Sequence, residues 1–376
     1  MGNSYRNFPY LFYRTLFTKG VFCGTIMKID KYRKGVKHVL QTDRQYFSTV
    51  MGAIGRTMLA FLVLFNVYGV GITLIDGILL LLPIGDVAYN VIYQTLYAAG
   101  YMLTFMLPVI VLRRSLRNKK CAVQPMSLSP RVSPMLVPIV FVGISICLGA
   151  AQINAEIVDL FGYSDFMSEM MGETMAAMEP YEIVLNFIVI SVVPAFCEEF
   201  LFRGAILANC RPFGRTNAII ISAVLFALMH QNVGQLLYTF AAGIVLGLIY
   251  EYTGSIWNCT VLHLCNNFLS IVQMAVLEKY GETMYAASIL TLIDVTVYLA
   301  GAVSLGILVH KYFSKKPNVN QGIFEKDMPV ADAYAAHPIR GREAAALFFR
   351  PSMIIFVVAA VLEMGALVLL SFSFYI

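Results

Sequence analysis

Two adjacent acids and an arginine interrupt a segment that otherwise has the composition of a membrane-spanning helix. Residues 194–204 read Pro-Ala-Phe-Cys-Glu-Glu-Phe-Leu-Phe-Arg-Gly, and the ionisable members are Glu198, Glu199 and Arg203. Charged groups at bilayer depth are costly, so they usually face a protein interior or a water-filled cavity and mark a functional site. We therefore expect a polar site along this helix.

Helical spacing separates the two acids by role. Glu199 and Arg203 are four residues apart on one helical face, so they can form an ion pair that offsets part of its own burial cost. Glu198 lies about 100° around the helix from Glu199, which leaves it free for another role. Pro194 lacks the backbone donor that would bond the carbonyl of Ile190, so it favours a kink beside the site.

Two histidines and an amide in other apolar segments complete the set of chemical groups. His263 and Asn267 are four residues apart and share one helical face, and His230 ends another apolar run. Counted from the expected cytoplasmic ends, Glu198 lies roughly 18 Å, His230 roughly 20 Å and His263 roughly 10 Å into the bilayer. These depths predict one shared cavity.

A carboxylate, two imidazoles and an amide are a sufficient set for peptide hydrolysis. Glu198 can accept a proton from water that His230 orients, while His263 and Asn267 can donate hydrogen bonds to the oxyanion of the tetrahedral intermediate. The same Glu198, His230 and His263 could instead bind a zinc ion, which leaves zinc open as a cofactor. No H-E-x-x-H sequence is present to support that alternative.

The composition shows what must position these groups. The chain has 376 residues, of which 59% are hydrophobic and 13% charged, and its mean hydropathy is +0.73. Such a chain is a polytopic membrane protein embedded in the lipid bilayer. The basic residues flank apolar spans without the basic-aromatic pattern of nucleic-acid binding. Seven cysteines, an odd number without a C-x-x-C pair, indicate neither a disulfide framework nor a cysteine zinc site.

We predict an all-α transmembrane helical bundle of about nine spans, with the catalytic core in spans four to seven. The expected spans are about 58–82, 88–112, a third ending near 159, 183–210, 217–230, 236–250, 256–277, 285–309 and 353–374. The basic run at 113–120 contains no acid and predicts a cytoplasmic loop. This orientation predicts a multi-pass plasma-membrane protein whose N-terminus lies on the cytoplasmic side.

The expected organisation has six parts. They are a basic cytoplasmic or interfacial segment at 1–50, N-terminal transmembrane helices at 51–175, a protease-like core at 176–280, an eighth span at 281–316, a polar cytosolic linker at 317–352 and a C-terminal span at 353–376. Gly243 and Gly247 have the G-x-x-x-G spacing that lets helices approach closely. Asp76 and Asp294 are intramembrane acids without a surrounding motif, which we expect to make capping or water contacts near helix ends.

Three motifs occur in order on successive spans: Glu198-Glu199-x-x-x-Arg203, Phe226-x-x-x-His230 and His263-x-x-x-Asn267. Together they resemble the motifs of the CPBP intramembrane protease family, also called the Abi or CAAX-protease family, over about residues 180–275. The resemblance implies a membrane-embedded endopeptidase in which Glu198 and His230 activate water and His263 and Asn267 stabilise the oxyanion. It also implies that Glu199 and Arg203 form a supporting pair.

The resemblance leaves the metal and the substrate open. Members of the family are often described as metalloproteases, although the family mechanism is glutamate-dependent, and some members are linked to bacteriocin immunity or partner scaffolding. The alternative functions are therefore a non-catalytic scaffold or immunity protein, or a transporter. A transporter should contain paired broken helices, for which Pro194 and Gly243 are the candidates. The expected partner is a peptide or protein substrate that enters from the membrane or the cytoplasmic side.

Overall fold

The structure is a computed structural model that describes residues 24–373, except for 125, 127, 129–131, 161–179, 315–338 and 340. Two predictions fall partly or largely outside these residues: the start of the basic segment and most of the polar linker. The chain divides into two compact units, Met1–Phe47 and Ser48–Ile376. All the candidate site residues belong to the second unit.

Every regular element in the described part of the chain is helical, which confirms the all-α class. In chain order the elements are α2 (Gly24–Leu80), α3 (Asp86–Asn118), α4 (Leu136–Asp159), α6 (Pro180–Asn186), η1 (Phe187–Val192), α7 (Val193–Glu199), η2 (Phe200–Leu207), α8 (Ala208–Cys210), η3 (Arg211–Phe213), α9 (Arg215–Met229), α10 (Val233–Thr253), α11 (Ile256–Tyr280), α12 (Met284–Ser314), α13 (Gly341–Phe348) and α14 (Pro351–Ser373). Helix α13 lies within the segment expected to be a polar linker.

Eight helical stretches are long and apolar enough to cross a membrane, so the chain is a multi-pass membrane protein. They are Asp43–Leu80, Asp86–Asn118, Leu136–Asp159, Tyr181–Phe213, Val233–Thr253, Ile256–Tyr280, Met284–Ser314 and Pro351–Leu369. The fifth expected span, 217–230, corresponds to α9, which has 15 residues. At 1.5 Å per residue α9 is about 22 Å long, shorter than the roughly 30 Å hydrocarbon core.

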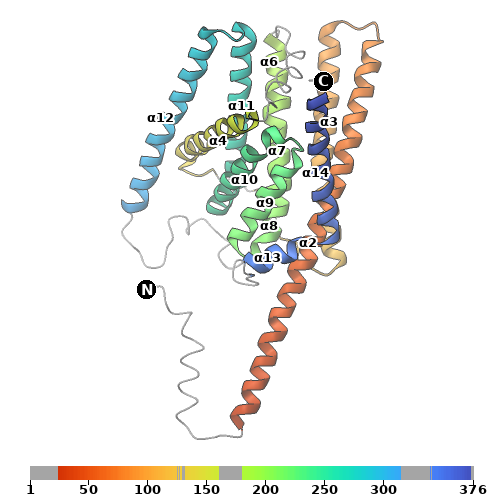
Figure 1. Ribbon diagram of the computed structural model, residues 1–376, viewed down its shortest axis with the longest axis vertical. Coiled ribbons are helices and arrows are strands. Elements are labelled where there is room, and N and C mark those ends of the chain that lie inside the picture. The colour runs from red at the N-terminus through yellow and green to blue at the C-terminus, as the bar shows by residue number, and fades with distance from the viewer. Residues whose placement is uncertain are drawn as a thin grey trace. The chain divides into compact units, whose positions relative to one another are not determined.

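Small residues hold the middle of the second unit together. Helix α10 packs most extensively against α9 and α4, and α4 also packs against α12, which it crosses at a steep angle (Figure 1). A Cβ atom at Gly243 would lie 2.9 Å from the Cα atom of Ala223 on α9. Gly247, one turn later, faces Ile219 in the same way. The G-x-x-x-G spacing thus allows the α9 and α10 backbones to approach, as predicted.

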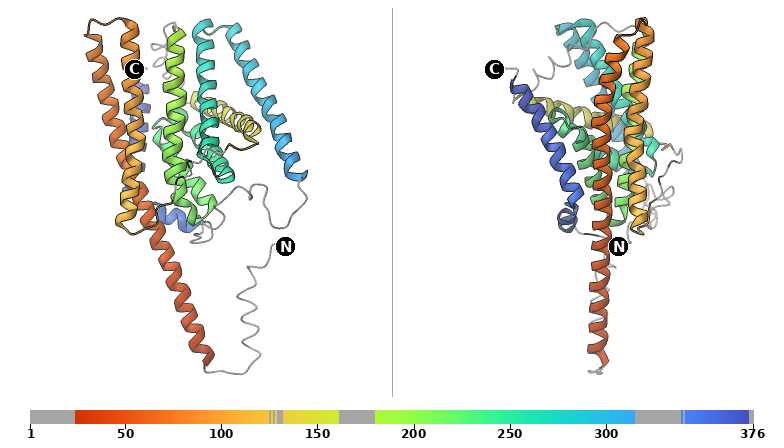
Figure 2. Two further views of the ribbon diagram at one scale, coloured as in Figure 1. Left: turned by 180° about the vertical axis from the view of Figure 1, so that it is seen from behind. Right: turned by 90° about the vertical axis from the view of Figure 1, so that its right-hand side faces the viewer.

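The span that carries the two acids is not a regular α-helix. Between Tyr181 and Phe213 the α-helical segments alternate with two π-helical stretches, η1 and η2, on either side of α7. The prediction of an irregularity at Pro194 agrees with this, because η1 ends two residues before the proline. Helices α3 and α11 both pack against this span, as the two views of Figure 2 also show. Irregular π turns of this kind occur frequently at functional sites.

Asp76 and Asp294, the two intramembrane acids without a motif, both accept hydrogen bonds from side chains on other helices. Asp294 accepts hydrogen bonds from the amides of Gln152 on α4 and Gln273 on α11, both at 3.0 Å. Because Asp294 lies well inside α12, its expected contact near a helix end was wrong, and it joins three helices instead. Asp76, in the last turn of α2, accepts a hydrogen bond from the Tyr89 hydroxyl. Both acids stabilise helix packing away from the candidate site.

Candidate active site

A cavity of about 350 Å³ opens between α3, η1, α7, α10, α11 and the end of α9. It is lined by four of the predicted site residues, Glu198, His230, His263 and Asn267, which come from three different parts of the chain. Glu199 and Arg203 do not line the cavity and lie behind it with fully buried side chains. The structure therefore separates the two adjacent acids in the way that helical spacing predicts.

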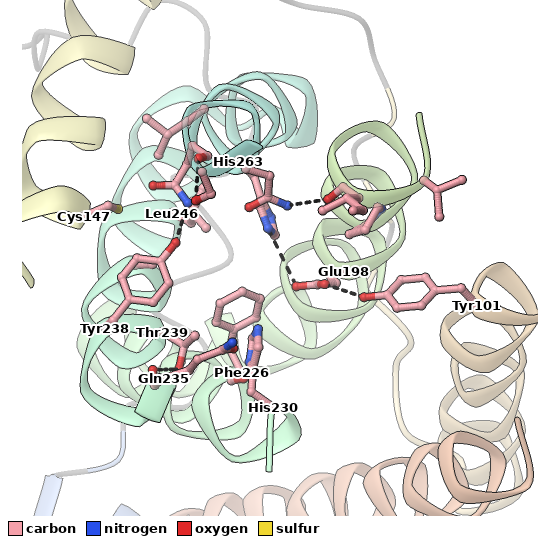
Figure 3. A pocket seen from close by; sticks show the side chains of 18 of the residues that line it. Tyr101, Cys147, Glu198, Phe226, His230, Gln235, Tyr238, Thr239, Leu246 and His263 are labelled. Carbon is pink, nitrogen blue, oxygen red and sulfur yellow. Dashed lines mark hydrogen bonds and ion pairs between the residues drawn. The ribbon is translucent and has the colours of Figure 1, made fainter. Parts of the chain in front are cut away.

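The Glu198 carboxylate is held from one side and faces the cavity on the other. Its Oε1 atom accepts a hydrogen bond of 2.6 Å from the Tyr101 hydroxyl on α3. Its Oε2 atom lies 3.8 Å from Nε2 of His263 and has no hydrogen-bond partner among the described residues. Figure 3 shows the carboxylate between Tyr101 and His263. One oxygen is thus anchored by Tyr101, and the other is buried beside His263 without a hydrogen-bond donor.

The predicted pairing of Glu199 with Arg203 is present. Nη1 of Arg203 lies 2.8 Å from Oε1 of Glu199, and both side chains are 0% exposed. Nη2 of Arg203 donates to the carbonyl of Gly243, and the guanidinium lies over the ring of Phe226. Burial of an ion pair is tolerated best when further hydrogen bonds satisfy its polar atoms. The contacts engage Oε1 of Glu199 and both terminal nitrogens of Arg203, whereas Oε2 of Glu199 and Nε of Arg203 have no hydrogen-bond partner among the described residues.

Glu199 has a second partner that helical spacing did not predict. Nδ1 of His263 lies 3.0 Å from Oε1 of Glu199. Because the Glu199 carboxylate is paired with Arg203, it accepts this hydrogen bond and Nδ1 of His263 carries a proton. Nε2 of His263 can then donate to a ligand only when the ring is protonated on both nitrogens. The ion pair therefore also orients a residue that lines the cavity.

The backbone of α9 orients His230. Nδ1 of His230 lies 2.8 Å from the carbonyl oxygen of Phe226, one turn earlier, to which it donates a hydrogen bond. This bond leaves Nε2 of His230 as a hydrogen-bond acceptor. The Phe226 ring packs against both His230 and His263, with ring centroids 5.0 Å and 5.9 Å apart. An acceptor nitrogen in this position suits a water molecule in the cavity.

Asn267 compensates for the proline in the broken span. Its Nδ2 atom donates a hydrogen bond of 3.3 Å to the carbonyl of Ile190, the group that Pro194 deprives of an α-helical donor. An amide nitrogen carries two hydrogens, so one N–H of Asn267 remains for another acceptor. The third motif is therefore tied to the irregular span through both His263 and Asn267.

Two further cavity residues were not among the predicted site residues. Asn266 lines the cavity and donates a hydrogen bond to the Tyr238 hydroxyl on α10. Tyr101 was not predicted at all. The recurrence of tyrosine every fourth residue in α3, at 89, 93, 97 and 101, was a visible sign that one face of this helix is distinctive. Nothing in the sequence indicated which of the four would reach Glu198.

The described residues contain no grouped metal ligands. Among them, no three His, Cys, Asp or Glu side chains are placed so that they could hold a metal ion. Nδ1 of His230 and Nδ1 of His263 are bonded to a backbone carbonyl and to Glu199, so Nε2 is the nitrogen that each ring keeps for a ligand. Metal dependence is therefore a question for the metal-removal experiment.

Comparison with known proteins supports the resemblance seen in the motifs. Residues 180–269 match the family model for the type II CAAX prenyl endopeptidase Rce1-like proteins, which confirms the resemblance over that segment. The chain is also 32% identical over 114 residues to "Putative membrane peptidase YdiL" of Bacillus subtilis (strain 168). The aligned region covers 29% of this chain and 46% of that protein, so the chain spans about half the length of this curated relative. No solved structure matches the chain at a significant level.

We predict that Arg203→Met lowers the free energy of unfolding by about 3–5 kcal/mol, because it leaves the Glu199 carboxylate buried without its cation. Chemical unfolding of the purified protein in detergent micelles measures the change. Arg215→Met is the matched control, since Arg215 is 44% exposed and lies 3.6 Å from its acid, Glu251. Its loss should cost less than about 1 kcal/mol. Equal stability of the two variants would contradict a structural role for the buried pair.

Proposed function

We propose that this chain is an intramembrane endopeptidase that hydrolyses peptide bonds with a water molecule activated by Glu198. The observation that carries the proposal is the convergence of Glu198, His230, His263 and Asn267 on one cavity inside a helical membrane bundle. The family match, whose description names an endopeptidase, and the relative named as a membrane peptidase support the same reaction class. A transporter is less well supported, because α10 continues through Gly243 without a break.

In the proposed first step a water molecule lies between Oε2 of Glu198 and Nε2 of His230. Glu198 removes one proton from the water while the water oxygen bonds to the carbonyl carbon of the scissile peptide. The electron pair of the carbonyl π bond moves to its oxygen and forms the oxyanion. The buried location of Glu198, which is 4% exposed, keeps bulk water from competing with the bound molecule.

Donors on α11 are suited to stabilise the oxyanion. Asn267, which keeps one N–H beyond its bond to Ile190, and His263 both line the cavity. Nε2 of His263 acts as a second donor when the imidazole carries a proton on both nitrogens. Preorganised donors of this type contribute roughly 3–4 kcal/mol each to transition-state stabilisation. Collapse of the intermediate re-forms the carbonyl and breaks the C–N bond. The proton held by Glu198 passes to the departing amine, which restores the carboxylate.

Glu198→Ala should lower the rate of peptide cleavage by roughly 10²–10⁴-fold, since it removes the proposed base. His263→Ala should lower it by roughly 10²–10³-fold, because it removes an oxyanion donor. The substrate for the assay is identified first, as the peptide that accumulates in membranes carrying the Glu198→Ala protein and disappears in wild type. Cleavage of that peptide by the purified proteins is then compared.

Asp294→Asn provides the control for this experiment. It removes an intramembrane acid of similar depth whose partners, Gln152 and Gln273, lie away from the cavity. This variant should cleave the peptide at close to the wild-type rate. Unchanged cleavage by Glu198→Ala or by His263→Ala would refute the proposed mechanism.

Metal removal should leave the activity intact. The proposed reaction uses the Glu198 carboxylate as the base and protein donors for the oxyanion, and the described residues form no ligand set. We therefore expect cleavage to continue at the same rate after dialysis against EDTA and in the presence of 1,10-phenanthroline. A loss of activity that zinc restores would instead support a metal at Glu198, His230 and His263.

We further propose that the N-terminus faces the cytoplasm of the plasma membrane and that the peptide substrate enters from the membrane or the cytoplasmic side. The basic run at 113–120, after α3, supports this orientation by the positive-inside rule. Alkaline phosphatase fused after Lys120 should be inactive in bacterial cells, and the same enzyme fused after Gly85, in the turn between α2 and α3, should be active. The opposite pattern would reverse the orientation.

A further inference from the structure

The Tyr101 ring is fixed by its neighbours on α2 and α3. It stacks on Phe105 with ring centroids 4.7 Å apart and on Tyr97 with centroids 6.4 Å apart. Tyr68 packs edge-on against it from α2, at 6.5 Å. Phe105 is 1% exposed, so the base of this stack belongs to the buried core. The direction of the Tyr101 hydroxyl is therefore set by packing, before any ligand binds.

This hydroxyl makes a strong contact with the proposed base. The distance of 2.6 Å from the Tyr101 hydroxyl to Oε1 of Glu198 falls in the range typical of a charge-assisted hydrogen bond to a carboxylate. No other side chain in the described part of the chain donates a hydrogen bond to Glu198, and the nearby Arg203 is bonded to Glu199 and Gly243. Tyr101 thus engages one oxygen of Glu198 and leaves the other, Oε2, without a hydrogen-bond donor among the described residues.

The contact comes from outside the part of the chain that resembles known proteins. Tyr101 lies on α3, whereas the family match begins at residue 180. Helix α3 packs against both α7 and η2, so it can transmit the rigidity of the N-terminal helices to the irregular span. The carboxylate of Glu198 would otherwise rotate about its last side-chain bonds, because Oε2 lacks a protein donor among the described residues.

We propose that Tyr101 is the positioning residue for Glu198. Its hydroxyl holds Oε1 so that Oε2 faces the water and the scissile peptide. The inference rests on the proposed function, in which Glu198 is the base. Tyr101 itself neither receives the proton nor touches the substrate, and no bond is made or broken at its hydroxyl.

The test compares Tyr101→Phe with Tyr93→Phe in the cleavage assay. Phenylalanine at 101 keeps the stacked ring and removes only the hydroxyl, whereas Tyr93 lies two turns earlier in the same stack and does not line the cavity. Misplacement of a catalytic group by about 1 Å can cost on the order of 100-fold in rate. We expect Tyr101→Phe to lower kcat by roughly 10- to 100-fold with KM unchanged, and Tyr93→Phe to match wild type.

Infrared spectroscopy tests the same inference without measuring peptide cleavage. Infrared difference spectra between wild type and Glu198→Gln isolate the carboxyl stretching band of Glu198. Loss of the Tyr101 hydrogen bond should shift this band in Tyr101→Phe and leave it in place in Tyr93→Phe. Unfolding temperatures of both variants are measured in parallel, so that a kinetic loss is counted only for folded protein.

The outcomes separate the two proposals. If Glu198→Ala is inactive but Tyr101→Phe keeps wild-type kcat, or if its Glu198 band does not move, the positioning role is wrong and the proposed function stands. If Glu198→Ala remains active while the Glu198 band moves in Tyr101→Phe, Tyr101 orients Glu198 but Glu198 is not the base. Equal kinetic losses in the 101 and 93 variants would also overturn the inference, because they would reflect the ring stack and not the hydroxyl.

Discussion

The buried ion pair between Glu199 and Arg203 is the interaction on which the rest of the site depends. Both side chains are fully buried in an apolar bundle, where an unpaired charge would be strongly destabilising. Two other helices also contact the pair, through the carbonyl of Gly243 on α10 and the imidazole of His263 on α11. The same pair that compensates the burial of charge therefore fixes the orientation of a cavity histidine, so packing and chemistry cannot be altered independently here.

A second constraint is the irregular span that carries the acids. Two π-helical stretches and Pro194 interrupt the α-helical pattern of backbone hydrogen bonds in this span. The carbonyl of Ile190 loses its α-helical donor. In a membrane an unsatisfied carbonyl must find a partner within the protein. Asn267 supplies one, which ties α11 to the broken span at the level of the cavity. The third motif therefore has a structural role beside the oxyanion role that we propose for it, and the amide of Asn267 has one N–H for each.

The cavity also depends on helices that carry no motif. Helix α3 brings Tyr101 to Glu198, and α10 brings Tyr238 to Asn266 on the opposite wall. The close approach of α9 and α10 at Gly243 and Ala223 holds the short helix before His230 against the core. A segment of about ninety residues that resembles a known family thus acquires a working geometry only within a larger bundle.

The sequence by itself determined the features that follow from composition and local spacing. It predicted the all-α membrane bundle, because the apolar runs are long, and the pairing of Glu199 with Arg203, because residues four apart share a helical face. Motif order and depth also brought Glu198, His230, His263 and Asn267 into one expected cavity.

Only the tertiary structure decided which groups from different helices meet. The second partner of Glu199, the hydroxyl that holds Glu198 and the amides around Asp294 depend on the tilt, rotation and register of neighbouring helices. A rotation of one helix by a single residue, about 100°, would exchange any of these contacts for another. Such rigid-body relations arise from the packing of the whole bundle, and no local pattern in the chain encodes them.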